Sequence, residues 1–304
     1  MAVYDRSTRQ PRKDLPEAYF KGLSFLLNEE PDKALKVFLE VVEVDSETVE
    51  MHMALGNLFR RRGEVERATR IHQNLVARSD LDESLRCMAL FELAQDYFKA
   101  GLYDRAENLF QELRKAKDFR NSANRLLLQI YDQEKEWHEA IHVASELDLE
   151  NELDYSKTIA HFYCEIAELA IGSGENRKAE IYLESAFKHD PRCIRAVIQS
   201  GRLASMRGNH TNAVAIWRGL EYWAPAAIGE VVGHVTNSYN ALGDKLSLKK
   251  FLEGAIEKNP DPRIITVLVE FTRTEQGVEA SQELLLELVR KYPSLESVHE
   301  LMQS

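Results

Sequence analysis

The sequence lacks the closely spaced cysteines that build zinc or redox sites. Its 304 residues include only Cys87, Cys164 and Cys193, and no two of them are closer than 29 residues. Because there is no C-x-x-C pattern, no zinc knuckle, zinc ribbon or redox pair is predicted. We interpret the three thiols as free, buried or half-buried, in a reducing compartment.

Long apolar runs and an excess of positive charge are also missing. No stretch approaches the roughly 18–20 apolar residues that span a bilayer, and the polar N-terminus MAVYDRSTRQPRKD does not resemble a signal peptide. The net charge is −11, which argues against nucleic acid and anionic membrane surfaces as main partners. With 44% apolar residues, 14 glycines and 8 prolines, the composition suits a helical globular chain.

Catalytic motifs are absent too, so we predict that the chain is not an enzyme. Gly172-Ser-Gly174 is not followed by the lysine of a P-loop, His138-Glu139 does not continue into H-E-x-x-H, and G-x-S-x-G does not occur. His161 and Cys164 are three residues apart on one predicted helix, where a metal ion could bridge them. We interpret them instead as a groove histidine beside a packed cysteine, and we predict neither catalytic residues nor metal ligands.

What the sequence does contain is a repeated pair of amphipathic helices. In the stretch 55–76, Leu55, Leu58 and Phe59 form one apolar stripe, and a second stripe begins at Ala68. Gly63 separates the stripes and is suited to the left-handed conformation that ends a helix. Two helices this short bury too little surface to be stable alone, so neighbouring copies are expected.

Small residues recur twelve apart and mark these copies. The pairs are Gly22/Ala34, Gly56/Ala68, Ala94/Ala106, Leu128/Ala140, Ala167/Ala179 and Gly201/Ala213, with leucine as the one large member. The second members are 34, 38, 34, 39 and 34 residues apart, and we place the extra residues of the longer steps between repeats, near 81–84 and 155–159. A period of 34 residues with a helix–turn–helix pattern is typical of tetratricopeptide repeats.

The predicted fold is therefore all-α, a right-handed superhelical tetratricopeptide-repeat (TPR) solenoid of about eight helix–turn–helix units. Residues 1–14 are expected to be a flexible lead-in, residues 15–295 the solenoid, and residues 296–304 the start of a truncated further helix. The units lie near residues 15–48, 49–82, 87–120, 121–154, 160–193, 194–227, 229–262 and 263–295.

In such a stack the first helix of each unit lines the concave face, where partner proteins bind. Polar and charged side chains on these helices, chiefly near the small residue of each repeat, form a mixed groove that we predict to be the binding surface. Its candidate residues are Asn57, Arg60, Gln95, Arg125, Gln129, His161, Glu168, Arg195 and Arg202.

Several longer strings go beyond the repeat pattern. GNLFRRRGEVERATRIHQNL (56–75), AGLYDRAENLF (100–110), LLLQIY (126–131), AHFYCEIA (160–167) and DFR (118–120) together resemble the lipopolysaccharide assembly protein B family of Gram-negative bacteria. The resemblance implies a non-enzymatic adaptor at the cytoplasmic face of the inner membrane. Such an adaptor presents the zinc-dependent lipid A pathway deacetylase to an FtsH-type AAA protease and acts with lipopolysaccharide assembly and transport proteins.

The two ends of the chain differ from that family. The family begins with a membrane helix and ends with a rubredoxin-like domain whose two C-x-x-C motifs bind zinc or iron, and neither is present here. We expect this chain to be a soluble fragment without a cofactor of its own, joined to the membrane only through a segment absent from the sequence.

Other functions stay open at this stage. A generic TPR protein-binding module or co-chaperone unrelated to lipopolysaccharide is the main alternative. One version of it clamps a C-terminal carboxylate with Asn and Arg or Lys from adjacent first helices. Asn57 and Arg60 could begin such a clamp, but Gln95 and Phe98 do not complete it. An enzyme with an unrecognised site is the third possibility.

Overall fold

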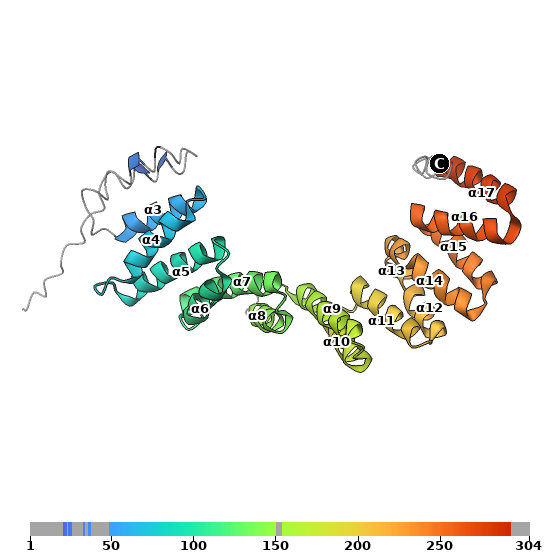
Figure 1. Ribbon diagram of the computed structural model, residues 1–304, viewed down its shortest axis with the longest axis horizontal. Helices are drawn as coiled ribbons and strands as arrows, with labels where there is room; N and C mark the ends of the chain where they lie inside the picture. The colour runs from blue at the N-terminus through green and yellow to red at the C-terminus, as the bar shows by residue number, and fades with distance from the viewer. Residues whose placement is uncertain are drawn as a thin grey trace, which may run out of the picture. The chain divides into compact units, whose positions relative to one another are not determined.

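The computed structural model describes residues 49–149 and 154–292, together with residues 21, 22, 24, 25, 33, 36 and 37. The described residues contain helices, turns and connecting segments and no strand (Figure 1), which confirms the all-α TPR prediction. The lead-in 1–14, most of the first unit and the helix predicted at 296–304 lie outside the described residues. Among the described helices, none has the length and apolar character needed to cross a bilayer.

The chain divides into two compact units, residues 1–136 and 137–304. In the first unit, each described helix packs against the next in the chain. These helices are α3 (Val49–Arg61), α4 (Val65–Val76), α5 (Glu83–Lys99), α6 (Tyr103–Leu113) and α7 (Lys117–Glu134). The first helices α3 and α5 also contact each other, as neighbouring repeats of a solenoid do.

The second unit has the same kind of arrangement. It contains α8 (Trp137–Leu149), α9 (Ser156–Gly172), α10 (Asn176–His189), α11 (Ile194–Met206), α12 (His210–Arg218), α13 (Leu220–Trp223), the short 3-10 helix η1 (Pro225–Ala227), α14 (Ile228–Leu242), α15 (Lys245–Lys258), α16 (Pro262–Gln276) and α17 (Val278–Lys291). The first helices α9, α11, α14 and α16 again contact one another in order.

The predicted turns within the repeats end helices in the left-handed conformation. Gly63, Gly101, Gly174, Gly208 and Gly243 all have positive φ values between 68° and 82°. The residue after each glycine donates its N–H to a carbonyl five residues earlier, as Glu64 does to Phe59, so the helix end is capped by backbone. At the end of α7, Lys135 adopts the same conformation with φ 61° in the absence of a glycine.

In several repeats a small residue of the first helix lies where that helix meets the second one. A Cβ atom at Gly56 would lie 2.3 Å from Nε2 of His72, and one at Gly201 would lie 2.2 Å from the ring of Trp217. Ala68, Ala106, Ala179 and Ala213, which open the predicted second stripes, are fully buried. The small residues therefore let two helices approach closely, as the twelve-residue spacing predicted.

The structure adds two local features to the predicted pattern. The extra residues near 81–84 and 155–159 lengthen first helices at their N-terminal ends, because α5 begins at Glu83 and α9 at Ser156. Asp82 caps α5 by accepting the N–H of Leu85, which stabilises the added turn of helix. The second helix of the repeat at 194–227 is also interrupted, since α12 ends at Arg218 and the short α13 follows Gly219.

The close crossing at Gly201 makes a direct prediction. Gly201→Ala should destabilise the second unit by about 1–3 kcal/mol, because the fully buried Trp217 ring has no room to move away. The matched control is Gly233→Ala in α14, where an added Cβ meets nothing within 4 Å. That change should stabilise by about 0.5–1 kcal/mol through helix propensity.

Urea unfolding followed by tryptophan fluorescence measures both variants, because Trp137, Trp217 and Trp223 all lie in the second unit. Equal shifts for the two alanine variants would contradict the proposed crossing.

Candidate protein-binding surface

Three predicted groove residues in the first unit meet around Glu92 of α5. Nη2 of Arg60 donates to Oδ1 of Asn57 at 2.8 Å and to Oε2 of Glu92 at 2.5 Å. The amide of Gln95 donates to the same Glu92 oxygen at 3.2 Å. α3 and α5 are thus joined by a polar network on first helices, where the repeat pattern placed these side chains.

A buried carboxylate lies below this network. Asp96 is fully buried, and its Oδ1 accepts a hydrogen bond from Nη1 of Arg60 at 2.8 Å. Its Oδ2 lies 2.5 Å from Nδ1 of His72, which is also fully buried. Nη1 of Arg60 also donates to the backbone carbonyl of Glu92 at 3.0 Å. We call Arg60, His72, Glu92 and Asp96 the Arg60 network.

The Arg60 network is structural in character. A buried charge is tolerated only when it is paired and hydrogen-bonded, and here Asp96 has partners on α3 and α4. Both terminal nitrogens of Arg60 are occupied by groups of the chain itself. Arg60 is therefore not available to begin a carboxylate clamp, which disfavours that alternative.

The other two predicted groove residues of this unit lie on α7. The side chains of Arg125 and Gln129 are exposed. They remain surface residues of a first helix, and their role in binding stays a prediction.

In the second unit the predicted residues pair across α9 and α11. Nη1 of Arg202 lies 3.1 Å from Glu168, and Arg195 pairs with Glu165. Glu168 also accepts the amide of the buried Gln199 at 2.9 Å. Glu165 and Gln199 were not among the predicted residues, although each lies two positions before the small residue of its repeat.

His161 and Arg195 both line an open cleft of about 920 Å³. Its walls come from α9, from the turn between α10 and α11, from α11 itself and from one residue of α14. We call it the α9–α11 cleft; its lining residues are Lys157, His161, Asp190, Pro191, Arg192, Cys193, Ile194, Arg195, Ile198 and Glu230.

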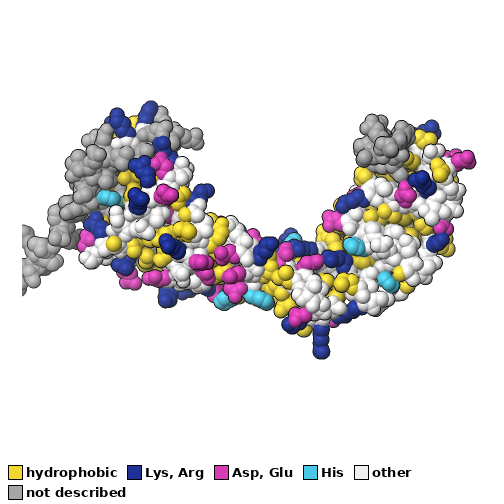
Figure 2. Space-filling view, viewed as in Figure 1, with side chains coloured by type: hydrophobic (Ala, Val, Ile, Leu, Met, Phe, Trp, Pro, Cys, Tyr) yellow, Lys and Arg dark blue, Asp and Glu magenta, His cyan; other side chains and the backbone are white. Residues whose placement is uncertain are grey.

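The cleft carries cations that the protein leaves unpaired. The side chains of Lys157 and Arg192 are exposed and form no hydrogen bond or salt bridge within the described part of the chain. Figure 2 shows acidic and basic side chains mixed over the visible face of each unit, so the overall charge of −11 does not prevent local positive sites. The chemistry of the cleft fits an extended segment that carries carboxylates.

The geometry separates His161 from Cys164. His161 is exposed in the cleft, whereas Cys164 is fully buried, so they do not form a shared metal site. Nowhere in the part of the chain that the structure describes do three His, Cys, Asp or Glu side chains gather as metal ligands would.

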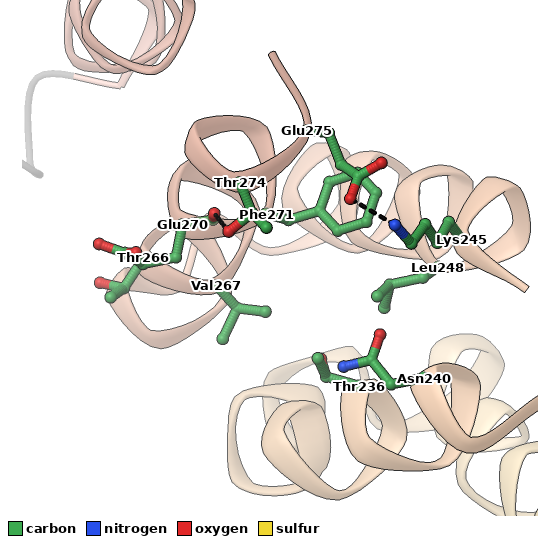
Figure 3. A pocket seen from close by; sticks show the side chains of 10 residues that line it. All are labelled: Thr236, Asn240, Lys245, Leu248, Thr266, Val267, Glu270, Phe271, Thr274 and Glu275. Carbon is green, nitrogen blue, oxygen red and sulfur yellow. Dashed lines mark hydrogen bonds and ion pairs between the residues drawn. The ribbon is translucent and has the colours of Figure 1, made fainter. Parts of the chain in front are cut away.

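A second pocket lies outside the predicted groove, between α14, α15 and α16. Its volume is about 410 Å³ and its walls are largely apolar, with Leu248, Val267 and Phe271 prominent in Figure 3. Oγ1 of Thr236 is buried there without a hydrogen-bond partner, and a Lys245–Glu275 ion pair lies at the rim. In its own repeat, Thr236 occupies the position that Gly56 and Gly201 hold in theirs. Aligning the later repeats, which lack the pair of small residues, with the earlier ones would therefore have located this pocket.

The comparisons with known sequences agree with the repeat pattern. The tetratricopeptide repeat family model matches residues 21–83 and 91–149. The lipopolysaccharide assembly protein B of Escherichia coli (strain K12) is 35% identical over 301 residues, covering 98% of this chain and 77% of that protein. The protein of the same name from Haemophilus influenzae is 30% identical over 311 residues, covering 98% and 78%.

Solved structures resemble the chain at lower identity. The C-terminal part of a TPR repeat-containing protein from Cytophaga hutchinsonii has a TM-score of 0.53 at 12% identity, covering 82% of this chain and 98% of that one. The Naa15/Naa10 complex bound to HypK gives 0.51 at 13% identity, covering 91% of this chain and 42% of the other. At such identities the similarity supports the helical repeat fold alone.

The Arg60 network predicts a specific loss of stability. Asp96→Asn should destabilise the first unit by about 3–5 kcal/mol, because it removes the buried carboxylate that pairs with both Arg60 and His72 and leaves Arg60 only its ion pair with Glu92. Hydrogen exchange of the α3, α4 and α5 amides measures this effect locally. Asp80→Asn is the control: the Asp80–Arg78 pair is on the surface and its removal should leave exchange unchanged. Equal amide protection in Asp96→Asn and Asp80→Asn would show that the buried Arg60–Asp96 pair contributes little to stability.

Proposed function

This chain belongs to the lipopolysaccharide assembly protein B family, and on that premise we propose that it acts as an adaptor in lipopolysaccharide assembly. It is a protein-interaction chain and not an enzyme, as its TPR fold and the names of its relatives indicate. The observation that carries the proposal is identity of 35% over 98% of the chain, combined with a cleft on the first helices that suits a polypeptide.

The partners in this proposal are the lipid A pathway deacetylase and an FtsH-type AAA protease. The adaptor presents the deacetylase to the protease at the cytoplasmic face of the inner membrane, and degradation then restrains lipopolysaccharide synthesis. This finer function rests on the family resemblance. The supporting physical feature is that a stack of rigid helix pairs offers separate surfaces to two proteins at once.

The α9–α11 cleft is the surface that we assign to one of these partners. Lys157 and Arg192 are free to bind carboxylates, while Arg195 and Arg202 are already held by Glu165 and Glu168. A partner segment with acidic side chains would pair with the two free cations without breaking an existing pair. This makes Lys157 and Arg192 better binding candidates than the paired Arg195 and Arg202.

Charge reversal in the cleft tests the binding site. Lys157→Glu combined with Arg192→Glu should weaken binding of the purified deacetylase by on the order of tenfold, because two favourable charge contacts become repulsive. The control reverses Arg177 and Lys188, two exposed cations on the second helix α10 of the same repeat. Calorimetry at low and high salt measures both variants. Unchanged affinity in the cleft variant, or an equal loss in the control, would place the deacetylase on another surface.

Delivery to the protease is a separate prediction, measured in cells. Depleting the adaptor from its own bacterium should lengthen the half-life of the deacetylase, because an adaptor raises the rate at which a protease captures its substrate. A chase with protein synthesis blocked gives the half-life, and a protease-deficient strain is the control in which depletion should have no effect. An unchanged half-life of the deacetylase in the parent strain would refute its delivery to the protease, although the adaptor could still bind it.

A further inference from the structure

Two of the three cysteines are brought together by the repeat. Sγ of Cys164, on α9, lies 3.8 Å from Sγ of Cys193, the residue immediately before α11. Both side chains are buried, and they are 29 residues apart in the chain. The third, Cys87, is partly exposed and lies in the other compact unit.

The fold does not require sulfur at these two positions. The equivalent positions one repeat later, 34 residues further along the chain, are occupied by Ile198 and Ala227. Both pack in the apolar core of the second unit, where ordinary hydrocarbon side chains fill the space. The thiol pair is therefore a local departure from a packing that the chain achieves elsewhere without it.

Cys193 has the surroundings of a reactive thiol. It occupies the N-cap position of α11, where the helix dipole favours a negative charge. The hydrogen bond from the Cys164 thiol lowers the pKa of Cys193 most, and the amide of Ala196 and the nearby His161 lower it further, against the opposing effects of burial and of the Asp190 carboxylate. In contrast, its contact with Cys193 and its burial raise the pKa of Cys164.

Access to Cys193 comes from the α9–α11 cleft. Cys193 is one of the residues that line this cleft, and His161 and Arg195 line it as well. The cleft has a volume of about 920 Å³, which is ample for a molecule as small as hydrogen peroxide, and Cys164 is not among its lining residues. Cys164 packs in the apolar core together with Cys193. Of the two cysteines, Cys193 therefore lines the cleft and Cys164 does not.

We propose that Cys193 and Cys164 form an oxidation site for small hydroperoxides, with Cys193 as the attacking thiolate and Cys164 as the resolving thiol. The Cys193 sulfur attacks one peroxide oxygen, the O–O bond breaks, and Cys193 becomes a sulfenic acid as hydroxide or alkoxide leaves. The Cys164 sulfur then attacks the sulfenic sulfur, the S–S bond forms and the S–O bond breaks. The departing oxygen takes the Cys164 proton and leaves as water, so the two thiols together supply the two electrons that reduce the peroxide.

The product is a disulfide between α9 and the start of α11. These segments form two walls of the cleft, so oxidation would fix their separation. Reduction by a small thiol reverses the change, since thiol–disulfide exchange restores both cysteines. The inference does not depend on the proposed adaptor function, because it concerns the chemistry of the isolated chain.

Hydrogen peroxide is the probe for the test. After treatment of the folded protein, the reaction is stopped, the chain is denatured and the remaining thiols are alkylated. We expect an intact mass lower by two hydrogen atoms before alkylation, a single alkyl group at Cys87, and a cross-linked peptide containing Cys164 and Cys193. Alkylation of all three thiols, or loss of the Cys87 thiol first, would refute the proposal.

Two variants assign the roles. In Cys164→Ser the reaction should stop at the sulfenic acid of Cys193, which gains one oxygen atom and is trapped by dimedone. In Cys193→Ser neither a disulfide nor a dimedone adduct should form at Cys164. Circular dichroism verifies that both variants fold. If Cys164→Ser does not fold, Cys164→Ile replaces it, because isoleucine is the residue at the equivalent position of the next repeat. Equal dimedone labelling of Cys164 and Cys193 would overturn the assignment of attacking and resolving thiols.

Discussion

The close approach of the two helices within a repeat is the contact on which the rest of this structure depends. Gly56 leaves room for His72, and Gly201 leaves room for Trp217, sixteen residues later in each case. A methyl group at either position would overlap a fully buried ring. Because the crossing fixes how one helix pair lies against the next, it also fixes which side chains of neighbouring repeats meet.

The interactions between repeats follow from that register. Their sequence separations stay close to the 34-residue period: 36 for Arg60 with Asp96, 34 for Arg202 with Glu168, and 30 for Arg195 with Glu165. The two thiols, 29 residues apart, obey the same geometry. All three cysteines are free, as the sequence predicted. In a solenoid, however, a large sequence separation does not keep two thiols apart in space, so the spacing of cysteines along the chain does not show which of them are neighbours.

The sequence was sufficient for the fold and for the turns, because both are recorded in apolar stripes and glycines that recur with the period. The sequence did not allow us to predict which buried positions carry polar or charged side chains. His72 occupies the position that Phe110, Leu183 and Trp217 fill in other repeats, and its carboxylate partner Asp96 lies on the next first helix. Periodicity reports which positions are buried but not which of them carry compensating charges. The extra turns of α5 and α9 escaped prediction for a related reason, since four or five added residues fit a longer helix as well as a connector.

The same register separates charged residues that support the fold from those that are free to bind. Arg60 has every hydrogen-bonding direction of its two terminal nitrogens directed at the chain itself, so a ligand would gain little and would expose a buried carboxylate. Lys157 and Arg192 have no such partners, and a ligand carboxylate would meet them at the small desolvation penalty of an exposed site. Position on a first helix is therefore insufficient to identify a binding residue in a repeat protein. The deciding property is whether the neighbouring repeat already satisfies the charge.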